Sequence, residues 1–240
     1  MYSTDAGVFL GKTLLQRRGE IGGARYVFVK LQGNKNELVF PTFGCKIMNP
    51  FKGTAKMYAG DLIEYRYNDD EKGATGYILK TYVVAKNTTN GTDTEIYIVR
   101  DGYKHIPFVG DIIMKAPATL DGTGTAVTVT KVEATVDTQE DVWKLTLSAT
   151  LTTLKAGDVL VEAAEVGNSK KPMVTNPNAM CPADYDFLYE PSTGDSDFDG
   201  ARYFMTPVLH GIAYIDRMSP MPKTVLAARN KSLVTGWFEL

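Results

Sequence analysis

The segments AGDLI (residues 59–63), VGDII (residues 109–113) and AGDVL (residues 156–160) repeat one short pattern through the middle of the chain. Each places an apolar residue before Gly-Asp and two branched apolar residues after it. Glycine accepts a positive φ angle and aspartate bonds nearby backbone amides, so Gly-Asp is turn chemistry that leads into a strand. The pattern predicts a β-built core over residues 58–171, and its spacings suggest a repeated module.

Alternation of apolar and polar residues predicts strands around these turns. Residues 62–67 place an isoleucine and two tyrosines on one face and Glu64 and Arg66 on the other. Residues 126–132 and 142–151 alternate on either side of a turn and predict an antiparallel hairpin. Further strands are predicted at residues 25–31, 37–40, 77–85, 95–99, 203–209 and 212–215, and a short helix at 222–228. We therefore expect an all-β protein, built as a small β-barrel or sandwich.

The chain divides into three regions that differ in composition and in hydrophobic periodicity. Residues 1–23 are glycine-rich and basic with no sustained period, and we expect an extended arm. Residues 24–167 form the β-rich body, which could consist of two modules at 24–100 and 101–167. Residues 168–240 are punctuated by proline and predict a loop-rich C-terminal β segment.

Charge and cysteine content narrow the class of protein. The 240 residues carry a formal net charge of −2, which gives no reason to expect a nucleic-acid or membrane partner. We expect no signal peptide and no membrane span, because no run approaches 18 apolar residues. The two widely separated cysteines, Cys45 and Cys181, predict buried free thiols and folding in a reducing cytoplasm.

One acidic stretch resembles the opening of a calcium loop. Asp195, Asp197 and Asp199 precede a glycine at the right spacing, but Thr206 stands where the bidentate carboxylate is needed. A solvated acidic loop is therefore the main interpretation, and a weak calcium site the alternative.

His105 and His210 are the two imidazoles of the chain, and neither has a nearby acid or nucleophile in sequence. We expect structural roles for both. The carboxylate pairs at residues 69–70 and at Asp184 with Asp186 are nominal candidates for glycosidase chemistry. The sequence predicts no catalytic residue, no cofactor and no metal beyond the weak calcium candidates.

Residues at both ends are candidates for partner binding. Arg17 and Arg18 lie in the basic arm, which we expect to dock on an acidic protein surface rather than on nucleic acid. Trp237 and Phe238, near the C-terminus, are large apolar residues that we expect to be covered by a partner surface.

Three segments of the C-terminal third, TNPNAMCPAD (residues 175–184), TPVLHGIAYI (206–215) and PMP (220–222), together resemble the end of head-decoration and head-fibre proteins of tailed bacteriophages, in particular crAss-like phages. The segment LKAGDVL (154–160) also resembles sequences of these phage proteins, and the resemblance covers about residues 95–240.

This resemblance implies a non-enzymatic virion protein, assembled in the host cytoplasm, that coats the major capsid lattice and cements its neighbours as a homo-oligomer, often a trimer. Arg17, Arg18, Trp237 and Phe238 are then the expected contacts with virion subunits. A head-to-tail connector ring or tail component is the alternative, since a basic arm suits insertion into a neighbouring ring subunit. A carbohydrate-binding or hydrolase module of a phage particle is the third interpretation.

Overall fold

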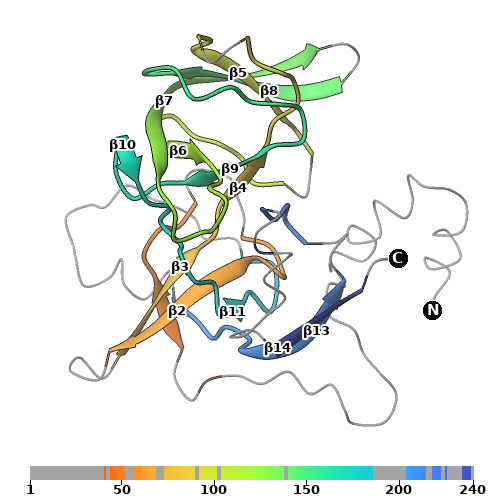
Figure 1. Ribbon diagram of the computed structural model, residues 1–240. Coiled ribbons are helices and arrows are strands. Elements are labelled where there is room, and N and C mark those ends of the chain that lie inside the picture. The colour runs from red at the N-terminus through yellow and green to blue at the C-terminus, as the bar shows by residue number, and fades with distance from the viewer. Residues whose placement is uncertain are drawn as a thin grey trace, which may run out of the picture.

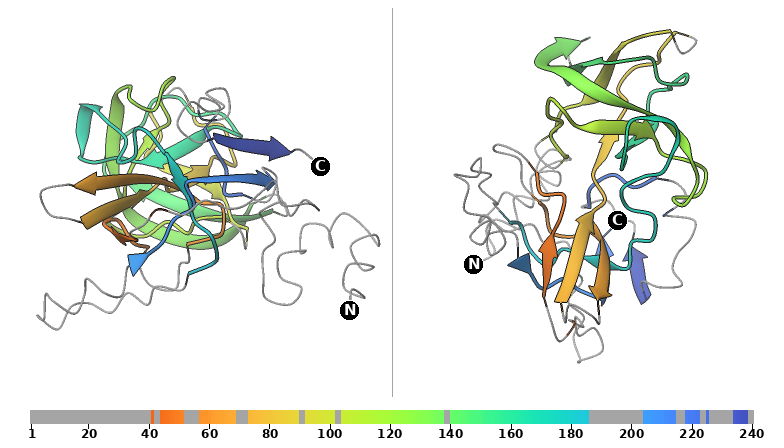
Figure 2. Two further views of the ribbon diagram at one scale, coloured as in Figure 1. Left: turned by 90° about the horizontal axis from the view of Figure 1, so that it is seen from below. Right: turned by 90° about the vertical axis from the view of Figure 1, so that its left-hand side faces the viewer.

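The computed structural model describes residues 41, 44–51, 57–68, 73–89, 92–101, 104–137, 140–185, 204–214, 218–222, 225 and 234–238. The described part is built from strands, which confirms the predicted all-β class. Two sheets make up most of it, one above the other in Figure 1, and the two further views show the same division (Figure 2).

The first sheet has five strands in the order β11-β2-β3-β1-β12. Strands β1 and β3 run parallel, and the other neighbours are antiparallel. Its buried face packs around Ile47, Ile63 and Ile78. The strands are β1 (Cys45–Ile47), β2 (Leu62–Asn68), β3 (Gly73–Ile78), β11 (Ala179–Met180) and β12 (Phe204–Met205).

The second sheet has seven strands, in the order β4-β9-β6-β7-β8-β5 with β10 paired to β7. It curls until its two edges meet, because Val84 after β4 forms a bridge with Ile98 in β5. Ile113, Leu145 and Leu160 lie in the core that this curl encloses. The strands are β4 (Thr81–Val83), β5 (Glu95–Val99), β6 (Ile112–Lys115), β7 (Gly124–Asp137), β8 (Glu140–Leu147), β9 (Val159–Glu162) and β10 (Gly167–Lys170).

A parallel pair, β13 (His210–Tyr214) and β14 (Val234–Phe238), forms a small third sheet. It brings the end of the chain beside the first sheet, with β13 and β14 lying next to β11 in Figure 1.

The chain passes directly from the first sheet to the second between β3 and β4. Ile78, Leu79 and Lys80 are all at most 4% exposed, so alternating exposure stops at the crossing. Residues 77–85, predicted as one strand, are therefore two strands in different sheets.

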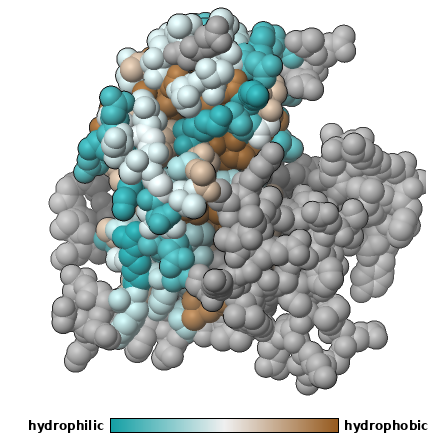
Figure 3. Space-filling view, viewed as in Figure 1, coloured by the Kyte–Doolittle hydropathy of each residue, from teal (hydrophilic) through white to brown (hydrophobic). Residues whose placement is uncertain are grey.

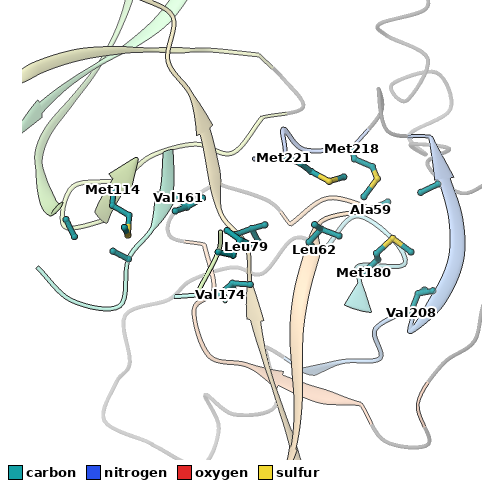
Figure 4. Close-up of a cluster of buried hydrophobic side chains, with 14 residues drawn as sticks. Ala59, Leu62, Leu79, Met114, Val161, Val174, Met180, Val208, Met218 and Met221 are labelled. Carbon is teal, nitrogen blue, oxygen red and sulfur yellow. The ribbon is translucent and has the colours of Figure 1, made fainter. Parts of the chain in front are cut away.

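A shared core fills the space between the two sheets. Leu62 and Met180 come from the first sheet and Met114 and Val161 from the second, with Leu79 between them (Figure 4). Burying each such side chain stabilises the fold by roughly 1.5–3 kcal/mol. The two sheets are thus packed into one body.

Other sequence-predicted elements differ in detail. The first hairpin strand is longer than predicted, since β7 covers 14 residues and extends past both ends of the predicted range 126–132. Its pairing with β8 contains a register shift after Val129. The two strands predicted near residues 203–215 do not pair with each other, since β12 pairs with β1 and β13 with β14. The predicted arm, the strands at 25–31 and 37–40 and most of the helix at 222–228 lie outside the described residues.

Among the described residues, no helix is long and apolar enough to span a membrane. The face of the second sheet seen in Figure 3 mixes hydrophilic and hydrophobic residues, with hydrophilic ones covering much of it. Val136, at the tip of the β7–β8 hairpin, is the most exposed large apolar side chain described.

Candidate functional site

The three Gly-Asp segments form one structural unit used three times. Their glycines have φ angles of 83°, 90° and 87° at positions 60, 110 and 157, which only glycine adopts without strain. In each turn the aspartate N–H donates to the carbonyl three residues earlier, at 2.9–3.1 Å. The aspartate carboxylate in turn accepts the N–H of that earlier residue, at 2.7–2.8 Å.

Each unit is also fixed to one residue that lies in a neighbouring strand or directly after one. The glycine N–H donates to that residue's carbonyl, and that residue's N–H donates to the aspartate carbonyl, all at 2.8 Å. Two residues facing one is the pattern of a β-bulge that begins with glycine. The partners are Cys181 for Gly60-Asp61, Val129 for Gly110-Asp111 and Val84 for Gly157-Asp158.

Beyond its own turn, each aspartate holds a different distant side chain. Asp158 accepts Lys115 Nζ at 2.7 Å near the surface. Asp111 accepts the Tyr82 hydroxyl at 3.2 Å. Burial and the Asp111 charge raise the pKa of Tyr82 well above its ordinary value, so the phenol keeps the proton that it donates.

The carboxylate of Asp61 is the centre of a sealed polar cluster between the two sheets. The His105 and Asp61 side chains are both 0% exposed, with Nε2 and Oδ2 3.0 Å apart. The Ser219 hydroxyl donates to Asp61 Oδ1, and its oxygen lies 3.2 Å from His105 Nε2. The Phe51 ring lies against the imidazole, with ring centroids 4.7 Å apart.

The hydrogen bonds fix the tautomer of His105. Nδ1 accepts the N–H of Thr81 at 2.9 Å, so the ring proton is on Nε2 and faces Asp61. The hydroxyl proton of Ser219 also points at Asp61 rather than at the imidazole. A general base needs a free nitrogen lone pair facing the nucleophile, and this arrangement offers none. The cluster fastens the β3–β4 crossing to the first Gly-Asp unit.

A second buried cluster lies at the same crossing. Glu162, at the end of β9, accepts Lys80 Nζ on Oε1 at 3.0 Å and Asn49 Nδ2 on Oε2 at 2.5 Å. Lys80 and Asn49 are 4% and 8% exposed. The side-chain amide of Asn49 also pairs with Ile78, accepting its N–H at 2.7 Å and donating to its carbonyl at 2.9 Å.

The two clusters are neighbours around Phe51 and Thr81. Lys80 Nζ lies 5.2 Å from the centroid of the Phe51 ring, whose other neighbour is His105. The hydroxyl of Thr81 is buried without a hydrogen-bond partner, the one such side-chain atom among the described residues. The junction is therefore rich in polar side chains that are mostly buried, with Glu162 partly exposed at 13% of its side chain.

Of the residues considered in the sequence analysis, His105 lies in the first cluster and the others lie elsewhere. Asp184 accepts the N–H of Ala59 at 2.8 Å and so supports the first Gly-Asp turn. Trp237 and Phe238 lie in β14, opposite Ala213 and Tyr214 of β13. His210 begins β13. Outside the described residues lie Arg17, Arg18, Asp69, Asp70, Asp186 and the calcium candidates Asp195, Asp197 and Asp199.

Sequence reasoning missed both clusters because their members are far apart in the chain. Asp61, His105 and Ser219 are brought together only by the crossing of the two sheets. One local signal was available: Lys80 and Glu162 each interrupt an apolar run, which marks a charge placed in a core.

In the part of the chain that the structure describes, no group of three or more His, Cys, Asp or Glu side chains could hold a metal ion. No protein-family model, curated protein or solved structure matches the chain.

Proposed function

We propose that the chain is a non-enzymatic structural subunit of a tailed-phage particle, a decoration protein that binds and stabilises the major capsid lattice as a homo-oligomer. The observation that carries the non-enzymatic part is the state of His105. Both ring nitrogens are engaged, the imidazole is sealed from solvent, and its neighbours hold the two sheets together. The virion part rests on the resemblance of residues 175–184, 206–215 and 220–222.

The fold suits such a role. Three pinned Gly-Asp turns and a shared core make a stiff body, and modest contacts repeated over a lattice add up to firm retention. We expect Arg17, Arg18, Trp237 and Phe238 to make the contacts with virion subunits.

The carbohydrate-binding interpretation is less well supported. Sugar-binding modules present several open aromatic faces; Phe204 in β12 is 55% exposed, but three other aromatic rings on the described strands each have a cation above them. Arg66, Lys86 and Arg100 lie 4.4–5.2 Å from the centroids of Tyr77, Tyr97 and Trp143. These pairs contribute about 0.5–1 kcal/mol each to the free energy of folding.

The proposal is tested on shells of the phage whose genome encodes this chain. Full-length protein is added to shells stripped of it, the shells are pelleted, and the decorated particles are imaged. We expect saturable binding at three-fold lattice positions, and weaker binding by a chain lacking residues 1–23. A single six-fold or twelve-fold collar would instead identify a connector. Failure to pellet with shells or to appear in particles would contradict both roles.

A further inference from the structure

The Asn49–Lys80–Glu162 cluster contains the reactants of a self-made cross-link. We propose that Lys80 and Asn49 join through an intramolecular isopeptide bond, Nζ to Cγ, with Glu162 carrying the protons. This inference is independent of the proposed function, since it rests only on the chemistry of these three side chains.

The first requirement is that the lysine amine and the asparagine amide are hydrogen-bonded to the same carboxyl group, which can transfer protons between them. Glu162 meets it, with Oε1 3.0 Å from Lys80 Nζ and Oε2 2.5 Å from Asn49 Nδ2. Such pre-positioning replaces a bimolecular encounter and so removes much of the entropic part of the barrier. The backbone adds to it, since the Lys80 N–H and Asn49 Nδ2 both donate to the Ile78 carbonyl.

The second requirement is a neutral amine. Lys80 is 4% exposed, and its Nζ is in direct contact with a carboxylate oxygen that can accept a proton, Glu162 Oε1, at 3.0 Å. Proton transfer between the two groups needs no intervening water.

The third requirement is a polarised carbonyl. Asn49 Oδ1 accepts the N–H of Ile78 at 2.7 Å, a donor aimed at the oxygen on which negative charge develops. The same residue's carbonyl holds Nδ2, so the orientation of the amide is fixed. Pro50 follows Asn49 and has no N–H, which prevents the usual loss of the asparagine amide to a succinimide.

The step balances without any outside reagent. Neutral Nζ attacks Cγ, and the electron pair of the carbonyl moves onto Oδ1. Glu162 returns its proton to Nδ2 and takes the remaining extra proton from Nζ. The Cγ–Nδ2 bond breaks and ammonia leaves, which then takes the proton from Glu162. The net change converts one ammonium group and one primary amide into a secondary amide and one ammonium ion.

The cross-link would tie the segment after β1 to the point where the chain crosses between sheets, closing a loop over residues 49–80. A covalent closure of this kind restricts the unfolded chain, as a disulfide does, in a protein whose described cysteines are both free. Such a bond would make the chain more resistant to unfolding without needing an oxidising compartment.

The test is the intact mass of the purified full-length chain under denaturing conditions, before and after prolonged incubation of the folded protein. We expect a deficit of one ammonia, about 17 Da. Trypsin should then release residues 47–52 joined to residues 73–86 as one branched peptide, uncut at Lys80.

Three variants sharpen the result. Lys80→Arg keeps the charge next to Glu162 but cannot form the bond, and Glu162→Gln removes the proton carrier, so both should show the full mass. Lys115→Arg is the matched control, because Lys115 pairs with Asp158 alone among carboxylates, and it should keep the deficit.

Wild-type chain that retains its full mass after incubation would overturn the proposal. So would a deficit that persists in Lys80→Arg, because a succinimide at Asn90-Gly91 loses the same ammonia. If a variant fails to fold, the branched peptide of the wild type decides the question, and its absence counts against the bond.

Discussion

At the scale of single residues, the Gly-Asp units show how much a short sequence can specify. Positive φ at glycine and the aspartate bond to the turn were predictable from the two residues alone, and the structure confirms the turns at all three sites. The distant partner of each aspartate was not predictable, because Tyr82, Lys115 and His105 reach it only through the packing of strands.

At Gly157 the free-energy cost of a positive φ angle can be measured without a change in side-chain packing. A methyl group at this position would meet nothing within 4 Å, so any cost of Gly157→Ala comes from its φ of 87°. We expect the free energy of unfolding to fall by about 1–2 kcal/mol, measured by denaturant titration. Gly157→Asn should lose less, because asparagine tolerates this conformation. Equal stability of Gly157→Ala and wild type would refute the turn geometry.

The aspartates predict a contrast between a buried and an exposed unit. In Asp61→Asn, an amide N–H replaces an oxygen that accepts from Ser219 or His105, leaving a buried donor without an acceptor. We expect a loss of about 2–4 kcal/mol. The matched change Asp158→Asn, at a partly exposed ion pair, should cost about 1 kcal/mol or less. Similar losses in both variants would show that the junction has no special role.

The two cysteines should be inert in the folded protein. Burial raises the pKa of the Cys45 thiol to about 12 and that of Cys181 well above its ordinary value. At pH 8 the thiolate of Cys45 is then about one part in ten thousand. Thiol titration at pH 8 should count no free cysteine in the native protein and two in denaturant. Rapid native labelling would contradict the burial of both.

At the scale of elements, the sequence predicted strands well where one face is wet. Strand β5 alternates as its residues suggest, and Leu145 and Leu147 of β8 are buried as the hairpin pattern indicates. Strand β2 departs from the predicted faces, because Glu64 is 8% exposed and Tyr67 is 45% exposed. Prediction failed at the β3–β4 crossing, because Ile78, Leu79 and Lys80 are all buried and a period of two no longer applies. Strands β11 and β12 are two residues long each, too short to show an alternation of apolar and polar residues.

Glu64 ties the segment before β11 to strand β2, and this contact should depend on pH. Burial raises the pKa of Glu64, but hydrogen bonds from Arg66 and from the N–H groups of Thr175 and Asn176 outweigh it and hold the pKa below its ordinary value. A carboxyl whose pKa is lower in the folded protein than in the unfolded chain stabilises the fold at pH values above the unfolded-state pKa. That contribution is lost as the pH falls through the folded-state pKa.

The measurement is stability against pH for wild type and Glu64→Gln. At neutral pH the variant should be less stable by a constant amount, and the two curves should converge as the pH falls through the lowered pKa of wild-type Glu64 and the carboxyl takes up its proton. A gap that does not change with pH would show that the charge of Glu64 is irrelevant. Thr135→Val, on the β7–β8 hairpin away from this segment, serves as a control with no expected change in slope.

At the scale of the whole molecule, the two sheets form one structural body. Their shared apolar core and the polar junction around Asp61 and His105 lie at the same interface, so neither sheet is complete without the other. The sequence indicated the β class and the turns, while this interface depends on residues more than 100 positions apart and could be found only in three dimensions.

Scanning calorimetry of the full-length chain tests this claim most directly. We expect one cooperative transition for the described body, with calorimetric and van't Hoff enthalpies in agreement, and Asp61→Asn should lower the temperature of that single transition. Two separate transitions in the wild type, of which Asp61→Asn shifts only one, would contradict it.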